Sequence, residues 1–238
     1  GSFASRVVAT KIVALDGTGD FTDIQSAIND LPSGGGVVYI REGTYTITAA
    51  ISVNVANTSV IGAGKSTMIT TASDITLLTT NNKNNVFIEK IYFYGPAAST
   101  QIGVDLGQSS SSSIINCWVE RSYTGVRIRA SNYSSILNNK ITACVDDAIT
   151  VVESASYMVI ANNHCYSNSG NGIKIGVTGD NPSRNIIYGN VCVSNTNRGI
   201  HIFTGTNNIV TSNVAYNNTT GQIDDTGTGT VIANNVVT

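Results

Sequence analysis

Residues 185–193 read NIIYGNVCV, and residues 208–216 read NIVTSNVAY. Both stretches place apolar residues before an asparagine and a second short apolar run after it, and MVIANNHCY (158–166) and SSILNNKIT (134–142) repeat the pattern. The asparagines form one series with intervals of 24, 27, 23 and 22 residues: Asn139, Asn163, Asn190, Asn213 and Asn235. A period of this size indicates a solenoid or propeller architecture.

A second repeated mark follows each asparagine, in GVRI (125–128), AITV (148–151), GIKI (172–175) and GIHI (199–202). Its intervals are 23, 24 and 27 residues, and one insertion at 177–184 explains the long interval in both series. Each unit therefore reads as one coil of three short strands, whose apolar side is buried only when neighbouring coils stack. We predict an all-β fold, a single-stranded right-handed parallel β-helix.

The asparagine series is expected to be structural, because a residue that recurs in every coil is a requirement of the fold. We expect each asparagine to point inward at a sharp turn, in a left-handed backbone conformation, with hydrogen bonds to the coils on both sides. Cys165 and Cys192 each follow a series asparagine by two residues, so they should be neighbours in adjacent coils. A disulfide and a stack of buried free thiols are both compatible with that placement.

The domain organisation predicted is one β-helix over residues 1–238, with stacked coils from about 36 to 238. Residues 1–10 are expected to be a tag or an extended segment. Residues 21–31 carry apolar side chains at helical spacing, and Thr22 with Gln25 matches a capping box. We therefore predict a short α-helix over 21–31 that caps the first coil.

Composition restricts the classes of partner. Lys and Arg total 13 against 15 Asp and Glu, which gives a formal net charge of −2, so the whole surface does not attract nucleic acid. No apolar run reaches the length that crosses a bilayer, and the four cysteines contain no CxxC pair for zinc. We expect no nucleic-acid partner and no membrane partner. No metal site is predicted, and a calcium ion on Asp146 and Asp147 is the one alternative left open.

The stretch DGTGDFTDIQSAINDLPSGGGVVYIREGTY (16–45) resembles the start of proteins of the pectate-lyase-like superfamily. Together with the asparagine coils, this resemblance covers nearly the whole chain. It implies a β-helix fold and a role on polysaccharides, but it does not select one activity, because one fold hosts many functions.

Three segments are similar to the polygalacturonase motifs DD, GHG and RIK: VDDAITV (145–151), NGIKIG (171–176) and RGIHIF (198–203). Asp146 and Asp147 match the acidic pair, whereas Asn171 stands where the family has histidine and His201 where it has arginine. The alginate-epimerase motif falls on Thr124 to Arg129, where Arg127 and Arg129 replace its aspartate and histidine, while Asp147 matches a family aspartate in the next coil. The resemblance therefore implies the position of a site more than its chemistry.

The site predicted from the residues lies on one outward face. Side chains alternate along a strand, so the residue after each inward aliphatic points to solvent, and these residues should form a column one coil spacing apart. The predicted substrate-binding residues are Asp105, Arg127, Arg129, Thr150, Asn171 and Arg198, and the predicted catalytic residues are Asp146, Asp147, Lys174 and His201.

A column of cations flanked by carboxylates suits a polymer of uronic acids, because arginine binds a carboxylate with two hydrogen bonds and lysine supplies a point charge. If the protein is an enzyme, a β-elimination is the reaction expected, with Lys174 or His201 as the base. Asp146 and Asp147 are expected to lie at the exposed edge of the face and to matter more for function than for stability.

The function predicted is processing of an acidic glycan by a lyase or a hydrolase. The alternative is a non-catalytic module that binds glycans or serves as a rigid spacer in a viral fibre or surface protein. Either role predicts a secreted protein or a virion surface. The last coil is expected to be covered, either by a second copy of the chain or by further residues of the protein, because its unpaired strands and apolar cross-section would otherwise face water.

Overall fold

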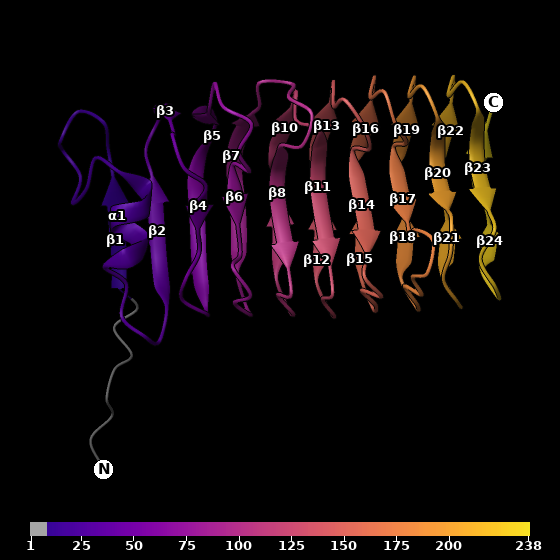
Figure 1. The fold of residues 1–238 in the computed structure, drawn as a ribbon, viewed down its shortest axis with the longest axis horizontal. Helices are drawn as coiled ribbons and strands as arrows, with labels where there is room; N and C mark the ends of the chain where they lie inside the picture. The colour runs from indigo at the N-terminus through magenta and orange to yellow at the C-terminus, as the bar shows by residue number, and fades with distance from the viewer. Residues whose placement is uncertain (1–8) are drawn as a thin grey trace, which may run out of the picture.

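The computed structural model describes residues 9–238 as a parallel β-solenoid, in which successive coils stack along one axis (Figure 1). The segment 1–10, which was predicted to be a tag or an extended segment, lies mainly outside this range. Three faces run along the solenoid, and from residue 102 on each coil contributes one strand to each face. Because every strand pairs with its equivalents in the neighbouring coils, equivalent residues form columns. This arrangement confirms the predicted register.

The first face is an eight-stranded parallel sheet. Its strands are β4 (Ile51–Ser52), β6 (Leu78–Thr79), β8 (Ile102–Gly107), β11 (Thr124–Arg129), β14 (Ile149–Val152), β17 (Ile173–Ile175), β20 (Arg198–Ile202) and β23 (Gly221–Asp225). This sheet carries the predicted site.

The second and third faces meet at the asparagine corner. The second face holds β9 (Ser113–Ile115), β12 (Ser135–Leu137), β15 (Val159–Ala161), β18 (Ile186–Tyr188), β21 (Ile209–Thr211) and β24 (Val231–Ala233). The third face holds β10 (Trp118–Glu120), β13 (Lys140–Thr142), β16 (His164–Tyr166), β19 (Val191–Val193), β22 (Val214–Tyr216) and β25 (Val236–Val237). Upstream, β5 (Thr58–Thr70) and β7 (Phe87–Tyr94) run through both faces, preceded by β1 (Ala9–Val13), β2 (Gly36–Ile40) and β3 (Gly43–Thr46).

A short helix, α1 (Ile24–Asn29), packs at the upstream end of the solenoid with Ile24, Ala27 and Ile28 buried (Figure 1). The predicted capping box is wrong. Asp23 is the N-cap residue, and its Oδ1 accepts a hydrogen bond from the Ser26 backbone N–H at 2.7 Å. Gln25 instead exchanges two hydrogen bonds with the backbone of Ser52, which fastens the helix to β4. That α1 serves as a cap stays a prediction.

The predicted asparagine ladder is present and continuous. The Nδ2 of each series asparagine donates to Oδ1 of the next at 3.0 Å, from Asn139 to Asn235. The same Oδ1 atoms accept the backbone N–H of the asparagine one coil upstream. The ladder therefore satisfies buried polar groups that no water reaches.

The prediction that the ladder asparagines themselves adopt the left-handed conformation is wrong by one residue. The residues with positive φ stand directly before the ladder asparagines: Asn138 (57°), Asn162 (56°), Gly189 (65°), Ser212 (56°) and Asn234 (55°). A left-handed residue turns the chain, and the next residue then points its carboxamide inward.

Two further ladders were not predicted. Asn168, Asn195 and Asn218 form one at the corner between the third and first faces, and Gln222 is its last acceptor. Asn185 and Asn208 form the other, at the corner between the first and second faces. All three corners thus rely on stacked side-chain amides over the downstream coils.

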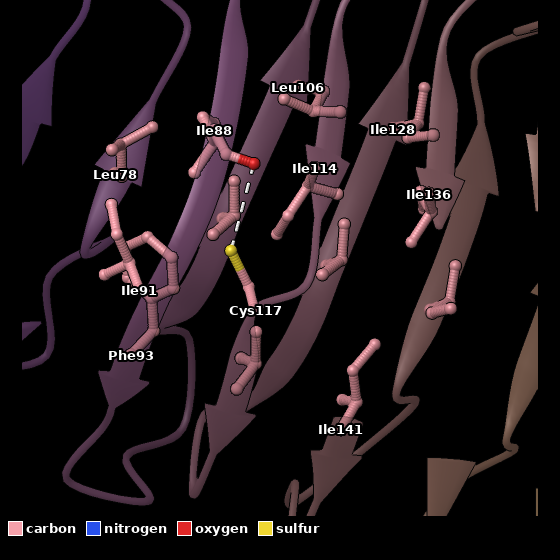
Figure 2. Packing of buried hydrophobic residues seen from close by; sticks show 14 of the residues in the cluster. Leu78, Ile88, Ile91, Phe93, Leu106, Ile114, Cys117, Ile128, Ile136 and Ile141 are labelled. Atoms are coloured by element: carbon pink, nitrogen blue, oxygen red, sulfur yellow. Dashed lines mark hydrogen bonds between the residues drawn. The ribbon is translucent and has the colours of Figure 1, made fainter. Parts of the chain in front are cut away.

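The core is one continuous column of aliphatic side chains, with Phe93 its largest fully buried member. Figure 2 shows Ile88, Ile114, Ile136 and their neighbours from successive coils stacked on one another. Cys165 and Cys192 are register partners, and all four cysteines are buried free thiols, so the thiol stack is the state found. Burial raises the pKa of the Cys117 and Cys144 thiols to about 12, which leaves them unreactive at neutral pH.

The last coil exposes apolar side chains, with Val236 at 57% and Val237 at 52%. That a second copy covers them stays a prediction. Within residues 9–238 no helix has the length and apolar character to span a bilayer.

Candidate functional site

The predicted column lies along the first face in the predicted register. Arg127 pairs with Asp105 upstream and with Thr150 downstream, and Thr150 is followed by Lys174 and His201. The inward neighbours on the same strands, including Val126 and Ile149, are fully buried and fix which side faces outward. Three members of the column were missed: Ser52 and Thr79 upstream and Asp224 downstream. Asp224 follows His201 by one 23-residue period, so the repeat contained the signal for it.

Asp105 forms ion pairs with the two upstream arginines, Arg127 and Arg129. Its Oδ2 lies 2.9 Å from Arg127 Nη2 and 3.3 Å from Arg129 Nε, and its Oδ1 accepts from Arg127 Nε at 3.3 Å. The carboxylate is 6% exposed, whereas the two arginine side chains are 34% and 29% exposed. Arg129 Nη1 also lies 3.9 Å from Glu153. Asp105 therefore holds both arginines in place, while part of each arginine side chain remains exposed to solvent.

Asp147 is a buried acceptor rather than an exposed edge residue, so that prediction is wrong for this half of the pair. The residue is 2% exposed. Its Oδ1 accepts from the backbone N–H of Asn171 at 2.7 Å and from Asn171 Nδ2 at 2.6 Å. Its Oδ2 accepts from the Thr150 hydroxyl at 3.3 Å and lies 3.9 Å from Lys174 Nζ. Thr150 and Asn171 are thus engaged in holding this carboxylate.

Asp147 is buried because it ends a short chain of hydrogen bonds. The donors of this chain point to the upstream coil, whereas the side-chain amides of the three ladders donate to the downstream coil. The Arg198 backbone N–H donates to Asn171 Oδ1 at 3.2 Å, and Asn171 donates in turn to the upstream coil at Asp147. A carboxylate only accepts hydrogen bonds, so Asp147 is a suitable last member. Alternation along a strand does not reveal this, because Asp147 precedes β14 at a corner.

Asp146 remains partly exposed next to this buried acid. Partial burial and the negative charge of Asp147 raise its pKa, while the Lys174 ammonium opposes the rise. Asp146 is therefore the partly exposed carboxyl group of the pair and the one whose pKa is raised.

Lys174, His201 and Phe203 form the downstream part of the site. The His201 ring meets Phe203 edge to face at 5.4 Å between centroids, and Lys174 Nζ lies 5.8 Å from the centre of the same phenyl ring. His201 is 7% exposed. Burial and the positive charge of Arg198 lower its pKa below 6.5, so the imidazole is neutral at pH 7. Arg198 Nε in turn lies 2.6 Å from Asp224 Oδ2.

The donor set does not fit the calcium ion that the sequence allowed. Within residues 9–238 no three His, Cys, Asp or Glu side chains are grouped as metal ligands. The calcium ion was expected on Asp146 and Asp147. Both carboxylate oxygens of Asp147 already accept internal hydrogen bonds, whereas calcium takes six to eight oxygen ligands.

Comparison with known proteins gives one family and a set of related folds. The family model described as right handed beta helix region matches residues 12–175 and 76–237. No curated protein sequence matches the chain.

Three solved structures illustrate the fold. The catalytic domain of a GH87 α-1,3-glucanase in complex with nigerose has a TM-score of 0.76 at 19% identity, over 90% of this chain and 43% of that one. The A-module of mannuronan C-5 epimerase AlgE6 from Azotobacter vinelandii has a TM-score of 0.70 at 20% identity, over 89% and 70%. ORF18 of Geobacillus virus E2 has a TM-score of 0.64 at 18% identity, over 89% and 56%. The chain thus spans less than half of the glucanase chain.

Proposed function

Because the chain belongs to the family of right-handed β-helix proteins, we propose that it processes an acidic, uronate-containing polysaccharide along its first face. Two of the similar folds are a glucanase with bound nigerose and a mannuronan epimerase, which supports a glycan as the partner. The outward cations of the first face support an acidic glycan. A polymer of this kind is met outside the cell, so we propose a secreted protein or a virion surface.

The observation that carries the proposal is the pairing of a neutral imidazole with an ammonium group on adjacent strands. Lys174 and His201 are register partners, and burial keeps His201 unprotonated at neutral pH. A neutral imidazole accepts a proton, whereas a neighbouring cation stabilises the negative charge that develops on a uronate. The pair therefore combines a base and an electrostatic stabiliser in one place.

The reaction that follows is a β-elimination. Lys174 and Arg198 bind the uronate carboxylate, and His201 removes the proton from the carbon next to it. The electron pair left behind forms a carbon–carbon double bond as the glycosidic oxygen departs. Asp146, whose pKa is raised, donates a proton to the leaving oxygen. Arg127 and Arg129 bind a further uronate of the same chain, and the buried Asp147 positions Lys174.

We expect His201→Ala to reduce formation of the unsaturated product at least roughly a hundredfold, since a general base contributes about 10²–10⁴ in rate. Lys174→Ala should cost about tenfold or more. The measurement is ultraviolet absorbance of the unsaturated uronate on pectate and alginate panels. Thr79→Ala, upstream of the charged residues in the same column, serves as a matched control. Full activity in both site variants would remove them from the mechanism.

The pH dependence of the reaction should show a limb set by His201. Since only the neutral imidazole accepts a proton, turnover should fall as pH decreases through the folded-state pKa, which lies below 6.5. The native state also binds this proton less tightly than the unfolded chain does, so acid in the same range lowers stability. Turnover against pH, with unfolding followed in parallel, separates the two effects. An acidic limb centred above pH 6.5 would contradict the assignment.

A non-catalytic glycan-binding module is the second candidate, and the position of Asp105 favours it. This carboxylate already binds donors of both Arg127 and Arg129, which leaves a partly neutralised surface suited to weak binding. Retention of a uronate oligomer without new reducing ends or unsaturated product would support it. Reducing ends without the unsaturated product would indicate a hydrolase.

A further inference from the structure

A hollow of about 330 Å³ opens on the third face, away from the first-face site. It is lined by Trp118, Lys90 and Lys140 together with the corner residues Asn116 and Asn138. Figure 1 places β5, β7, β10 and β13 in this order along the solenoid, so the hollow spans the coils where the upstream strands give way to the regular repeat. Its volume is within the range of small-molecule sites.

Gly64 of β5 lines the hollow, and β5 is irregular at this corner. The pairing of β5 with β7 shifts register between Ile61 and Gly64 and again between Gly64 and Met68. Gly64 has φ = +80°, and no atom lies within 4 Å of the position where a Cβ would stand. The regular coils place a ladder asparagine and its left-handed neighbour at the equivalent corner. The irregular strand thus leaves one side of the hollow open.

The side chains that line the hollow combine an aromatic surface with an uncompensated charge. Trp118 and Lys140 are register partners on β10 and β13, and Trp118 is partly exposed. Lys140 Nζ lies 5.1 Å from the centre of the Tyr166 ring, and among residues 9–238 no carboxylate lies within ion-pair distance of it. Lys90, in contrast, pairs with Glu89 at 3.0 Å. Lys140 is therefore the cation available to a ligand.

The fold does not require these side chains. The same outward column holds Tyr92 upstream of Trp118 and His164 and Val191 downstream of Lys140. Packing at this position therefore does not require an indole beside an ammonium group, because successive coils carry tyrosine, tryptophan, lysine, histidine and valine there.

We propose that this hollow binds one acidic sugar residue, with its pyranose ring on the Trp118 indole and its carboxylate on Lys140. The apolar face of a sugar ring packs on the flat indole, which also offers an N–H donor. The ammonium group selects a uronate over a neutral sugar through a charge-assisted hydrogen bond. The site is separate from the first face, so the protein holds an acidic polymer at two places, and the proposal does not depend on turnover at the first face.

The sequence supplies a direct probe, because Trp118 is its one tryptophan. Titration with oligogalacturonate or oligomannuronate at low salt should change the intrinsic tryptophan fluorescence, and a neutral glucan oligomer of equal length should not. Lys140→Met keeps the apolar stem and removes the charge. It should raise the Kd obtained from the fluorescence titration by about tenfold. Lys174→Met makes the same change on the first face and should leave the response intact.

Calorimetry completes the test. Trp118→Ala should lose the heat of this site while retaining first-face binding, and Trp118→Phe should restore part of it. An absent response in the wild type, an equal response to neutral glucan, or an unchanged response in Lys140→Met would overturn the proposal. A fluorescence response in a protein that turns nothing over would support the hollow while removing the proposed reaction. Turnover of uronate without any response would do the reverse.

Discussion

Replacing Asn190 with alanine is expected to lower the free energy of unfolding by about 4 kcal/mol. Its Oδ1 accepts two hydrogen bonds from Asn163, and its Nδ2 donates to Asn213 and to the Ile160 carbonyl. Asn190 is 0% exposed, so water cannot replace these bonds. A buried polar group left without a partner costs about 1–3 kcal/mol, and alanine leaves several. Urea unfolding followed by circular dichroism measures the loss.

The matched control is Asn235→Ala, at the last position of the same ladder. Asn235 accepts two hydrogen bonds from Asn213 and donates one to the Val210 carbonyl. It is only partly buried, so water can replace these bonds, and the loss should be about 1 kcal/mol. Equal losses at the two positions would mean that the ladder contributes no more in the middle of the solenoid than at its edge.

Asp147→Ala is expected to lower the free energy of unfolding by about 3 kcal/mol. The substitution leaves the backbone N–H and the side-chain amide of Asn171 without an acceptor in a buried corner. It also removes the partner of the Thr150 hydroxyl. This result would make Asp147 chiefly a structural residue, contrary to the expectation from its match with catalytic motifs.

Two variants isolate the cause. Asp147→Asn retains one oxygen for Asn171 and should cost about 1 kcal/mol. Asp146→Ala, at the partly exposed neighbour, should change stability by about 0.5 kcal/mol or less while reducing product formation. If Asp146→Ala unfolds the protein as readily as Asp147→Ala, the two carboxylates have been assigned to the wrong roles.

Most of the fold could be predicted because a coil imposes its period on the sequence. The spacing of Asn139, Asn163 and Asn190 gave the register of the strands, and the same period placed Arg127, Lys174 and His201 in one column. Asn168, Asn195 and Asn218 follow intervals of 27 and 23 residues, which match those of the first ladder. The second ladder was therefore available in the sequence and was missed.

The rest depends on corners, where no simple periodicity gives the direction of a side chain. The burial of Asp147 follows from a hydrogen-bond chain that starts on the next coil at Arg198. The Asp105 contacts depend on the rotamers of two arginines, and the hollow beside Trp118 depends on an irregular strand far from it in sequence. Such features arise from the packing of several coils rather than from one local pattern.

The three corners of a coil differ in how much length variation they tolerate. From β9 onward, the turn between the second and third faces has two residues in every coil, Asn138 and Asn139 in one and Gly189 and Asn190 in another. A third residue there would displace the carboxamide from its column. The corner after the first face, in contrast, already accommodates the longer segment 176–185 between β17 and β18 without a break in either sheet. Loops grafted at that corner border the proposed binding surface, so ligand selectivity can diverge there, by natural variation or by engineering, while the scaffold remains unchanged.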